Sequence, residues 1–254
     1  MLRTRVIPCL LLKNLGLVKT IKFRDPTYLG DPINIVKIFN DKEVDELTFL
    51  DITATIENTS PPFDLLAKIT TECFMPLGYG GGIRRVQDIE RILNLGVEKI
   101  VVNSYAVEKP SFIKAAAELA GSQAIVVSID VKKNRLGEYE VYTHSGQKAT
   151  GLNPVTHAIE MEKQGAGEIL LTSIDRDGTM QGYDLELTKQ VSKAVGIPVV
   201  ACGGAATVQH LVEAVKLGGA SAAAAGSMFV FQGPLRAVLI SYPTPQELRN
   251  AFGA

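Results

Sequence analysis

The sequence predicts an α/β protein, specifically a (β/α)8 barrel built from two homologous half-barrels. Three observations support this prediction. A chain of 254 residues, 46% of them hydrophobic, can bury a full-sized core. Eight short apolar runs alternate with amphipathic segments, which is typical of either a closed barrel or an open doubly wound sheet. An internal repeat favours the barrel, because two equal halves of four βα units close into eight strands, whereas an open sheet has no reason to repeat in this way.

The expected strands are short runs dominated by apolar residues. In chain order they are Arg5–Leu12, Leu47–Thr53, Met75–Gly80, Lys99–Asn103, Ala124–Asp130, Glu168–Ser173, Pro198–Cys202 and Ala220–Ala225. The last run is rich in alanine and is expected only from its place in the series. Between the strands, apolar residues recur at spacings of three and four, as in Val86–Leu95 and Val208–Leu217, which predicts amphipathic helices.

The internal repeat has an offset of 122 residues (198 − 76), because the segment Pro76–Gly82 aligns with Pro198–Gly204. The same offset relates Leu95-Gly96 to Leu217-Gly218 and Glu46 to Glu168. No linker-like tract separates the two copies. We therefore expect one domain over residues 1–254, with half-barrels at about 1–120 and 121–254.

Two segments interrupt the regular alternation of strands and helices. Lys13–Asp31 follows the first strand, and Lys132–Gly151 follows the fifth and contains an expected small hairpin at Glu138–Thr143. Both come after the carboxyl ends of strands, where barrel enzymes place their active sites. We interpret them as functional lids, with tolerated insertion as the alternative.

Composition excludes several classes of protein. With 26 basic and 27 acidic residues the net charge is −1, which predicts no nucleic-acid or anionic-membrane partner. No apolar run reaches the ~18 residues of a membrane span, and the N-terminus does not resemble a secretory signal. The three cysteines are far apart in the sequence, which indicates a reducing compartment such as the cytoplasm; they are Cys9, Cys73 and Cys202. The three histidines lack the spacing of metal ligands, which predicts no metal site; they are His144, His157 and His210. No cofactor is expected.

Loops that suit a phosphate follow four of the expected strands, and three of them contain glycine. Gly80–Gly82 and Asn103-Ser104 lie in the first half, and Gly203-Gly204 and Gly226-Ser227 occupy the matching places in the second. Glycines allow backbone N–H groups to approach phosphate oxygens. Although glycines also serve tight turns, two symmetric pairs favour a substrate with a phosphate at each end.

Carboxylates also follow the strands. Asp51, Asp130 and the segment Asp175–Thr179 should meet at one barrel mouth, where they are candidate general acids or bases, with helix capping as the alternative. Aligning the first strand with the fifth places Leu11 opposite Asp130. The symmetry of the barrel predicts a second carboxylate at this position, but the residue is a leucine, which cannot transfer a proton.

Together, these residues resemble the HisF family, the cyclase subunit of imidazole glycerol phosphate synthase, over about nine-tenths of the chain. The motifs that carry the resemblance are Arg5–Leu10, Asp45–Ala54, Gly80–Arg84, Val141–His144, Gly165–Ser173, Asp175–Thr179 and Gly182–Thr188. The resemblance implies a partner glutaminase that releases ammonia. It also implies a reaction in which ammonia attacks a ribonucleotide carrying two phosphates, giving an imidazole glycerol phosphate and an aminoimidazole carboxamide ribotide.

The resemblance assigns roles to individual residues at the mouth. Asp130 matches one of two catalytic aspartates, Lys19 matches a lysine of a mobile loop over the substrate, and Asp51 and Asp177 match polar groups lining the site. The first phosphate site corresponds to Gly82, Asn103 and Ser104. The second corresponds to Gly178, Thr179, Gly203, Gly204, Gly226 and Ser227.

At the opposite ends of the strands, four charges match the family's ring at the ammonia entrance: Arg5, Glu46, Lys99 and Glu168. Without the resemblance, charges at strand starts usually form a solvated rim. The resemblance implies that the glutaminase docks on this N-terminal face, with Asp45 and Glu98 as interface charges.

The chain also departs from the family pattern. Leu11 stands where the family has its other catalytic aspartate. Gly78, followed by Tyr79, replaces a small hydroxyl residue of the channel. Beyond Phe231, the usual last helix is expected to be replaced by Arg236–Tyr242 and a proline break. This combination resembles HisF paralogues of bacterial surface-polysaccharide clusters, which act with a glutaminase paralogue and a sugar amidotransferase to form acetamidino sugars.

Four functions are therefore in competition. The first is the ammonia-using cyclase, and the second is the polysaccharide paralogue, with cyclase activity reduced or absent. The third is a non-catalytic scaffold that conducts ammonia. The fourth, the related sugar isomerase of histidine synthesis, is disfavoured because it needs no ammonia gate.

Overall fold

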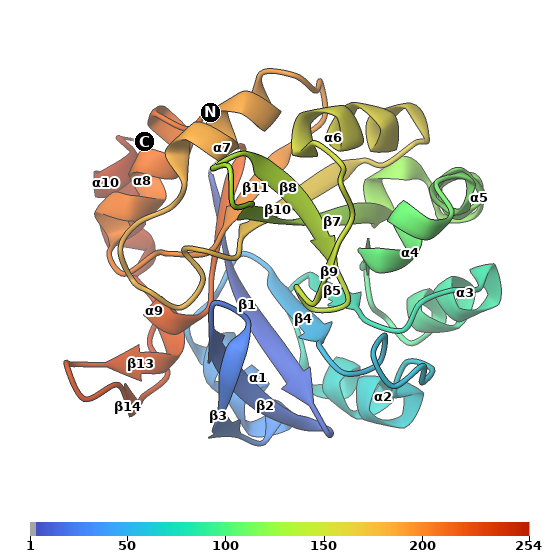
Figure 1. Cartoon of the computed structure of the whole chain (residues 1–254). Helices are drawn as coiled ribbons and strands as arrows, with labels where there is room; N and C mark the ends of the chain where they lie inside the picture. Colours follow the sequence, from blue (N-terminus) through green and yellow to red (C-terminus); the bar gives the residue numbers. More distant parts are fainter. Residues whose placement is uncertain (1–3, 254) are drawn as a thin grey trace.

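A computed structural model describes residues 4–253 and shows a closed (β/α)8 barrel (Figure 1). Within these residues, eight parallel strands pair in the order β10-β11-β12-β1-β4-β5-β6-β7, and β7 pairs with β10 to close the barrel. The strands are β1 (Arg5–Lys13), β4 (Leu47–Asp51), β5 (Leu77–Gly80), β6 (Lys99–Val102), β7 (Ile125–Lys133), β10 (Glu168–Ser173), β11 (Val199–Cys202) and β12 (Ala222–Ala225). The expected barrel is confirmed. Residues 1–3 and 254 of the expected domain lie outside the described residues.

Helices follow the strands and surround the barrel (Figure 1). They are α1 (Pro32–Asp41), α2 (Phe63–Glu72), α3 (Val86–Asn94), α4 (Ser104–Glu108), α5 (Ser111–Ala120), α6 (Pro154–Lys163), α7 (Leu185–Ser192), α8 (Val208–Lys216), α9 (Ser227–Val230) and α10 (Pro245–Phe252), with a short 3₁₀ turn at Ser122–Ala124. Local sequence sets several of their starts. Asp31 and Asn153 cap α1 and α6, each followed by a proline in the first turn.

The core has two layers, as the alternation of strand side chains requires. Outward-facing residues such as Phe49 and Tyr79 pack against the helices in one large cluster. Inward-facing residues form a second cluster inside the barrel: Ile7, Cys9, Val101, Val126, Leu170, Val200, Cys202, Ala222 and Ala224. The alanine-rich β12 is fully buried and paired on both sides, with β1 and β11, so tertiary pairing makes it a strand despite its weak local preference.

Two hairpins extend the carboxyl ends of β1 and β7. Strands β2 (Gly16–Ile21) and β3 (Arg24–Gly30) continue antiparallel from β1, and β8 (Tyr139–Thr143) and β9 (Lys148–Ala149) continue from β7. The hairpin expected near residues 138–143 is therefore confirmed. Because β1 and β7 run on into these hairpins, both are longer than predicted.

The C-terminal tail corrects one expectation. The last helix is not replaced, because α10 is present and packs against α8. A small hairpin of β13 (Phe231–Gln232) and β14 (Ala237–Val238) precedes it, next to α9 (Figure 1). The proline break is the start of this helix, since Thr244 forms a capping box with Glu247 and a proline occupies the first turn. No helix among residues 4–253 is long and apolar enough to cross a membrane.

Candidate functional site

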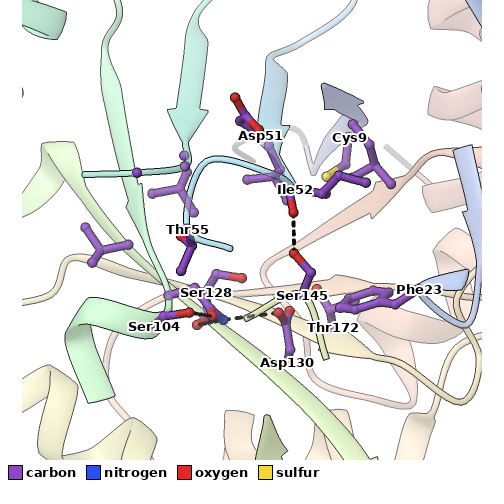
Figure 2. Close-up of a pocket in the computed structure, with 18 of the residues that line it drawn as sticks. Cys9, Phe23, Asp51, Ile52, Thr55, Ser104, Ser128, Asp130, Ser145 and Thr172 are labelled. Atoms are coloured by element: carbon purple, nitrogen blue, oxygen red, sulfur yellow. Dashed lines mark hydrogen bonds between the residues drawn. The ribbon is translucent and has the colours of Figure 1, made fainter. Parts of the chain in front are cut away.

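A pocket opens at the carboxyl ends of the barrel strands, and we call it the mouth pocket (Figure 2). It encloses about 1100 Å³ of space, measured out into its open entrance. The predicted site residues that line it are Leu11, Lys19, Asp51, Gly82, Asn103, Ser104, Asp130, Asp177 and Gly226. Residues from both halves of the repeat therefore converge on one cavity.

Asp130, near the middle of β7, is the buried carboxyl of this pocket. Asn103 Nδ2 donates a hydrogen bond to Asp130 Oδ2 at 3.1 Å. Burial, and secondarily the negative charge of Asp177, raise the pKa of Asp130 from 3.8 to about 7, although hydrogen bonds from Ser128, Thr172 and Asn103 oppose the rise. A carboxyl with this pKa can both donate and accept a proton at neutral pH.

Leu11 lines the same pocket as Asp130. It pairs with Val18 of β2 on one side and Leu50 of β4 on the other, so its backbone is part of the sheet and its position is well determined. The symmetric counterpart of Asp130 in the first half is thus an apolar side chain at the pocket wall. The pocket lacks a proton-transfer group at this position.

The other two aspartates of the pocket are engaged in the fold. Asp51 Oδ1 accepts hydrogen bonds from the backbone N–H groups of Thr53 at 2.9 Å and Ala54 at 3.0 Å, so it caps the turn after β4. Its carboxylate points away from Asp130 (Figure 2). Asp177 accepts two hydrogen bonds from Lys19 Nζ, at 2.8 and 3.0 Å, and both side chains are buried. Lys19 therefore points into the barrel here, paired with Asp177.

The first cradle consists of Gly82, Asn103 and Ser104. Gly82 has φ +68°, and a Cβ there would lie 2.5 Å from the carbonyl oxygen of Thr59, so only glycine fits. Ser104 Oγ donates to Asn103 Oδ1 at 3.1 Å and accepts from the backbone N–H of His144 at 3.0 Å. All three residues line the mouth pocket and present polar groups there.

The second cradle consists of Gly178, Thr179, Gly203, Gly204, Gly226 and Ser227. Gly203 and Gly204 have φ +92° and +114°, and a Cβ on Gly204 would lie 2.1 Å from the Gly182 carbonyl oxygen, so this close approach also requires glycine. Of the six, only Gly226 lines the mouth pocket. A Cβ on Gly178 would lie 2.4 Å from the carbonyl oxygen of Thr20, which places β2 directly against this cradle.

Both hairpins at the mouth contact the loops beneath them. The backbone N–H of Lys22 donates to the Asp177 carbonyl at 2.9 Å, and Ser145 Oγ donates to the Ile52 carbonyl at 2.7 Å (Figure 2). Phe23 and Ser145, one from each hairpin, line the pocket. In this structure the hairpins thus form part of the pocket wall.

A closed ring of four charges lies at the opposite end of the barrel; we call it the charge ring. Lys99 Nζ donates to Glu46 at 2.9 Å and to Glu168 at 2.6 Å. Arg5 completes the ring with ion pairs to the same two glutamates, the pair with Glu46 measuring 2.5 Å. Both glutamates are buried, at 4% and 5% exposure, so each needs the cations that face it.

A small space lies at the charge ring and extends into the barrel; measured out into open solvent, it amounts to about 270 Å³. Its remaining lining is mostly apolar: Ile7, Thr48, Val101, Val126, Leu170 and Val200. Val101 also lines the mouth pocket, so its side chain contacts both spaces. Gly78 lies on the neighbouring strand, where a Cβ would lie 3.1 Å from Thr48 Oγ1. Tyr79 instead faces the outer core and donates to the Gly81 carbonyl at 3.1 Å.

The two expected interface charges have different surroundings. Glu98 is exposed at the start of β6. Asp45 is half-buried and accepts hydrogen bonds from the backbone N–H of Val6 at 3.0 Å and from Tyr242 Oη at 3.4 Å. Asp45 therefore also ties the start of β1 to the C-terminal tail.

Sequence reasoning did not assign two arginines beside the cradles. Arg84 lines the mouth pocket and donates to Asn58 Oδ1 and to the Thr55 carbonyl. Its place right after the glycine loop could have revealed it. Arg236 contacts Gly178 and Ser227 of the second cradle from the β13–β14 hairpin, and no local motif marks it. Across residues 4–253, no group of three or more His, Cys, Asp or Glu side chains could hold a metal ion.

Comparison with known proteins gives a consistent result. Residues 5–235 match the family described as "Histidine biosynthesis protein". A protein of Pseudomonas aeruginosa named "Putative imidazole glycerol phosphate synthase subunit hisF2" is 48% identical over 248 residues, covering 98% of this chain and 99% of its own length.

Two further relatives are similar over their full lengths. A Leptospira interrogans protein named "Putative imidazole glycerol phosphate synthase subunit HisF" is 48% identical over 256 residues, covering 99% of this chain and 100% of its own. A Vibrio vulnificus protein carrying the same description with the suffix hisF3 is 46% identical over 253 residues, covering 99% and 97%.

Proposed function

The chain belongs to the histidine biosynthesis protein family, as a HisF-type barrel, and from that premise we propose that it is the synthase subunit of a glutamine amidotransferase complex. In this proposal the mouth pocket binds a ribonucleotide with two phosphates, and ammonia from a partner glutaminase reacts with it there. The observation that carries the proposal is that the two ends of the barrel carry different polar groups. A pocket lined by the first cradle, by Gly226 of the second cradle and by the carboxyl of Asp130 lies at one end, and a closed charge ring lies at the other.

At the mouth, the first cradle would hold one phosphate through Gly82, Asn103 and Ser104. The second cradle would hold the other after the β2–β3 hairpin moves aside, because β2 now lies against Gly178. Asp130, with a pKa of about 7, would give up or take up the proton that must move when ammonia forms a bond to carbon. Lys19 would be released from Asp177 as that hairpin opens, since it belongs to β2.

At the other end, the charge ring supports docking of a HisH-like glutaminase on the N-terminal face. A ring of two acids and two bases satisfies its own buried charges and blocks the barrel, so ammonia can enter only if a partner opens or bypasses it. Asp45 and Glu98, beside the ring, would contribute to the interface. All three cysteines of the chain are free thiols, which suits a complex working in the cytoplasm.

Leu11 favours a second candidate function. Asp51 caps a turn and Asp177 is paired with Lys19, so neither is placed as a second proton-transfer group beside Asp130. A step that needs two such groups therefore lacks one. The second candidate is a paralogue that serves acetamidino-sugar formation together with a sugar amidotransferase. A third, a non-catalytic scaffold that conducts ammonia, would retain the charge ring and dispense with Asp130.

An assay with free ammonia tests the proposal without the partner. The purified barrel is given the family's ribonucleotide and ammonium chloride, and formation of the two products is followed for the unaltered protein and for Asp130→Asn. Turnover that the substitution removes supports the synthase. Absence of turnover with ammonia, and also with glutamine and the cognate glutaminase, would contradict it and favour the second candidate.

A further inference from the structure

We propose that Arg236 is the cationic ligand of the second cradle, where its guanidinium binds the phosphate at one end of the substrate. This proposal rests on the proposed function, because it takes a phosphorylated substrate at the barrel mouth as given. It adds a binding residue from the β13–β14 hairpin, which lies in the connection between β12 and α10, beyond the glycine loop at Gly226-Ser227.

The guanidinium is held directly on the cradle. Arg236 Nη1 donates to the Gly178 carbonyl at 3.1 Å, and Nη2 contacts Ser227 Oγ at 3.3 Å. Its Cζ lies 4.6 Å from the centre of the Phe231 ring, which supports the flat face of the group. Ser227 is only 4% exposed, so the arginine reaches a buried member of the cradle.

The positive charge of Arg236 is not neutralised by an acid. Among residues 4–253 no carboxylate lies within 4.0 Å of its guanidinium nitrogens, and its partners are a carbonyl, a hydroxyl and an aromatic ring. Lys19, whose aliphatic stem lies against Gly226 of the same cradle, is instead paired with Asp177. A phosphate needs a cation when water is displaced, and the planar donor fork of arginine suits its oxygens.

The internal repeat explains why the tail supplies this arginine. At the first cradle Arg84 follows the glycine loop and is held by two neutral oxygens, Asn58 Oδ1 and the Thr55 carbonyl. The offset of 122 places Ala206 at the equivalent position of the second half. The second half therefore lacks its own arginine after the glycine loop, and Arg236 brings the same group to the equivalent cradle.

The hairpin presents Arg236 in a defined direction. The turn between β13 and β14 closes with a hydrogen bond from the Arg236 N–H to the Gly233 carbonyl at 3.1 Å, and Arg236 adopts φ +52°, a left-handed conformation that is unfavourable for an arginine. The preceding Leu235 is 95% exposed. In this conformation the side chain of Leu235 faces the solvent and that of Arg236 faces the second cradle.

The test is a titration with inorganic phosphate at low ionic strength, followed by NMR on the full ¹⁵N-labelled chain. The amide signals of Gly204 and Ser227 report the second cradle, and those of Gly82 and Ser104 report the first. The variants are Arg236→Gln, Arg236→Lys and a matched control, Arg135→Gln. The control removes an exposed arginine from the tip of the β7–β8 hairpin, where no cradle lies.

We expect Arg236→Gln to weaken phosphate binding at the second cradle about tenfold, the loss typical of a charge-assisted hydrogen bond, and to leave the first unchanged. Arg236→Lys should be intermediate because it keeps the charge without the fork. Arg135→Gln should change neither cradle. Thermal unfolding shows whether each variant is folded. If Arg236→Gln does not fold, Arg236→Lys provides the test, again by weaker phosphate binding at the second cradle with the first unchanged.

Two results would overturn the inference, and they differ in what they say about function. Phosphate binding at both cradles that is unaffected by either Arg236 variant removes the role of Arg236 and leaves the proposed function standing. Failure of phosphate to bind either cradle of the unaltered protein removes both the inference and the phosphorylated substrate of the proposed function.

Discussion

Replacing Asp130 with asparagine should remove a loss of stability that the unaltered protein suffers as the pH rises toward neutrality, and it also removes the proposed acid–base group. The pKa of Asp130 is about 7 in the folded protein and 3.8 for an ordinary aspartate, so folding favours the protonated carboxyl. Below pH ~4 the carboxyl is protonated in both states, and its preference for the folded state is fully present. As the pH rises to 7 that contribution is lost.

The size of the effect follows from the difference between the two pKa values. At about 1.4 kcal/mol for each tenfold change in proton affinity, the unaltered protein should lose about 4 kcal/mol of unfolding free energy relative to Asp130→Asn between pH 4 and pH 8. The pH dependence is the informative quantity, because the new amide group also faces the donors Asn103, Ser128 and Thr172 and can shift the stability at every pH.

The assay is urea denaturation of both proteins at pH 4, 5, 6, 7 and 8, with ammonia-dependent activity measured alongside. Asp25→Asn, which removes an exposed carboxylate from β3, serves as the control and should follow the unaltered protein. If Asp130→Asn and the unaltered protein lose stability in parallel across this range, Asp130 is not a buried carboxyl of raised pKa, and the reasoning that makes it the proton-transfer group fails.

Further expectations concern the rest of the site. Leu11→Asp should raise ammonia-dependent turnover of the family's ribonucleotide at least about tenfold, since it restores a carboxylate to the pocket wall opposite Asp130, and steady-state kinetics check it. Glu168→Gln should lower the unfolding free energy by about 2 kcal/mol in urea denaturation, because Arg5 and Lys99 lose a buried anionic partner. The loss is moderate because Arg5 remains partly solvated. An unchanged urea midpoint of unfolding would count against a coupled ring. Glu98→Lys should weaken co-purification with the cognate glutaminase without changing the melting temperature, since exposed charges add little to folding. Asp45→Lys should do both, costing about 1–3 kcal/mol through the lost hydrogen bond from the Val6 N–H; equal melting temperatures for these two variants would refute the distinction.

The sequence predicted the barrel strands closely because their signals are local. Each strand is a short apolar run, and seven of the eight runs could be recognised without reference to the others. The strand Ala222–Ala225 was expected only from its place in the series of alternating strands and helices, since alanine carries little preference for a strand. The last helix was missed because the altered residues before Pro245 obscured a start that depends on the Thr244–Glu247 capping box.

The candidate site was predictable where it depends on position along a strand. Parallel strands bring their carboxyl ends together, so Asp130 and the first cradle were expected to meet, and they line one pocket. The pairing of Lys19 with Asp177 was not predictable, because it depends on how the β2–β3 hairpin folds back over the barrel. Arg236 was not predictable either, since its contact with Gly178 joins positions 58 residues apart through a hairpin that has no recognisable motif.

The sequence by itself therefore determined the barrel, its two halves and the chemical groups at the strand ends, including the leucine at position 11. These properties follow from periodicity, repetition and residue identity, all of which are present in the linear chain. Only the tertiary structure decided what those groups can do: it raised the pKa of Asp130, paired Lys19 with Asp177, closed the charge ring and brought Arg236 to the second cradle. Desolvation and Coulomb interactions depend on distances through space, and residues far apart in the sequence acquire those distances only when the barrel closes.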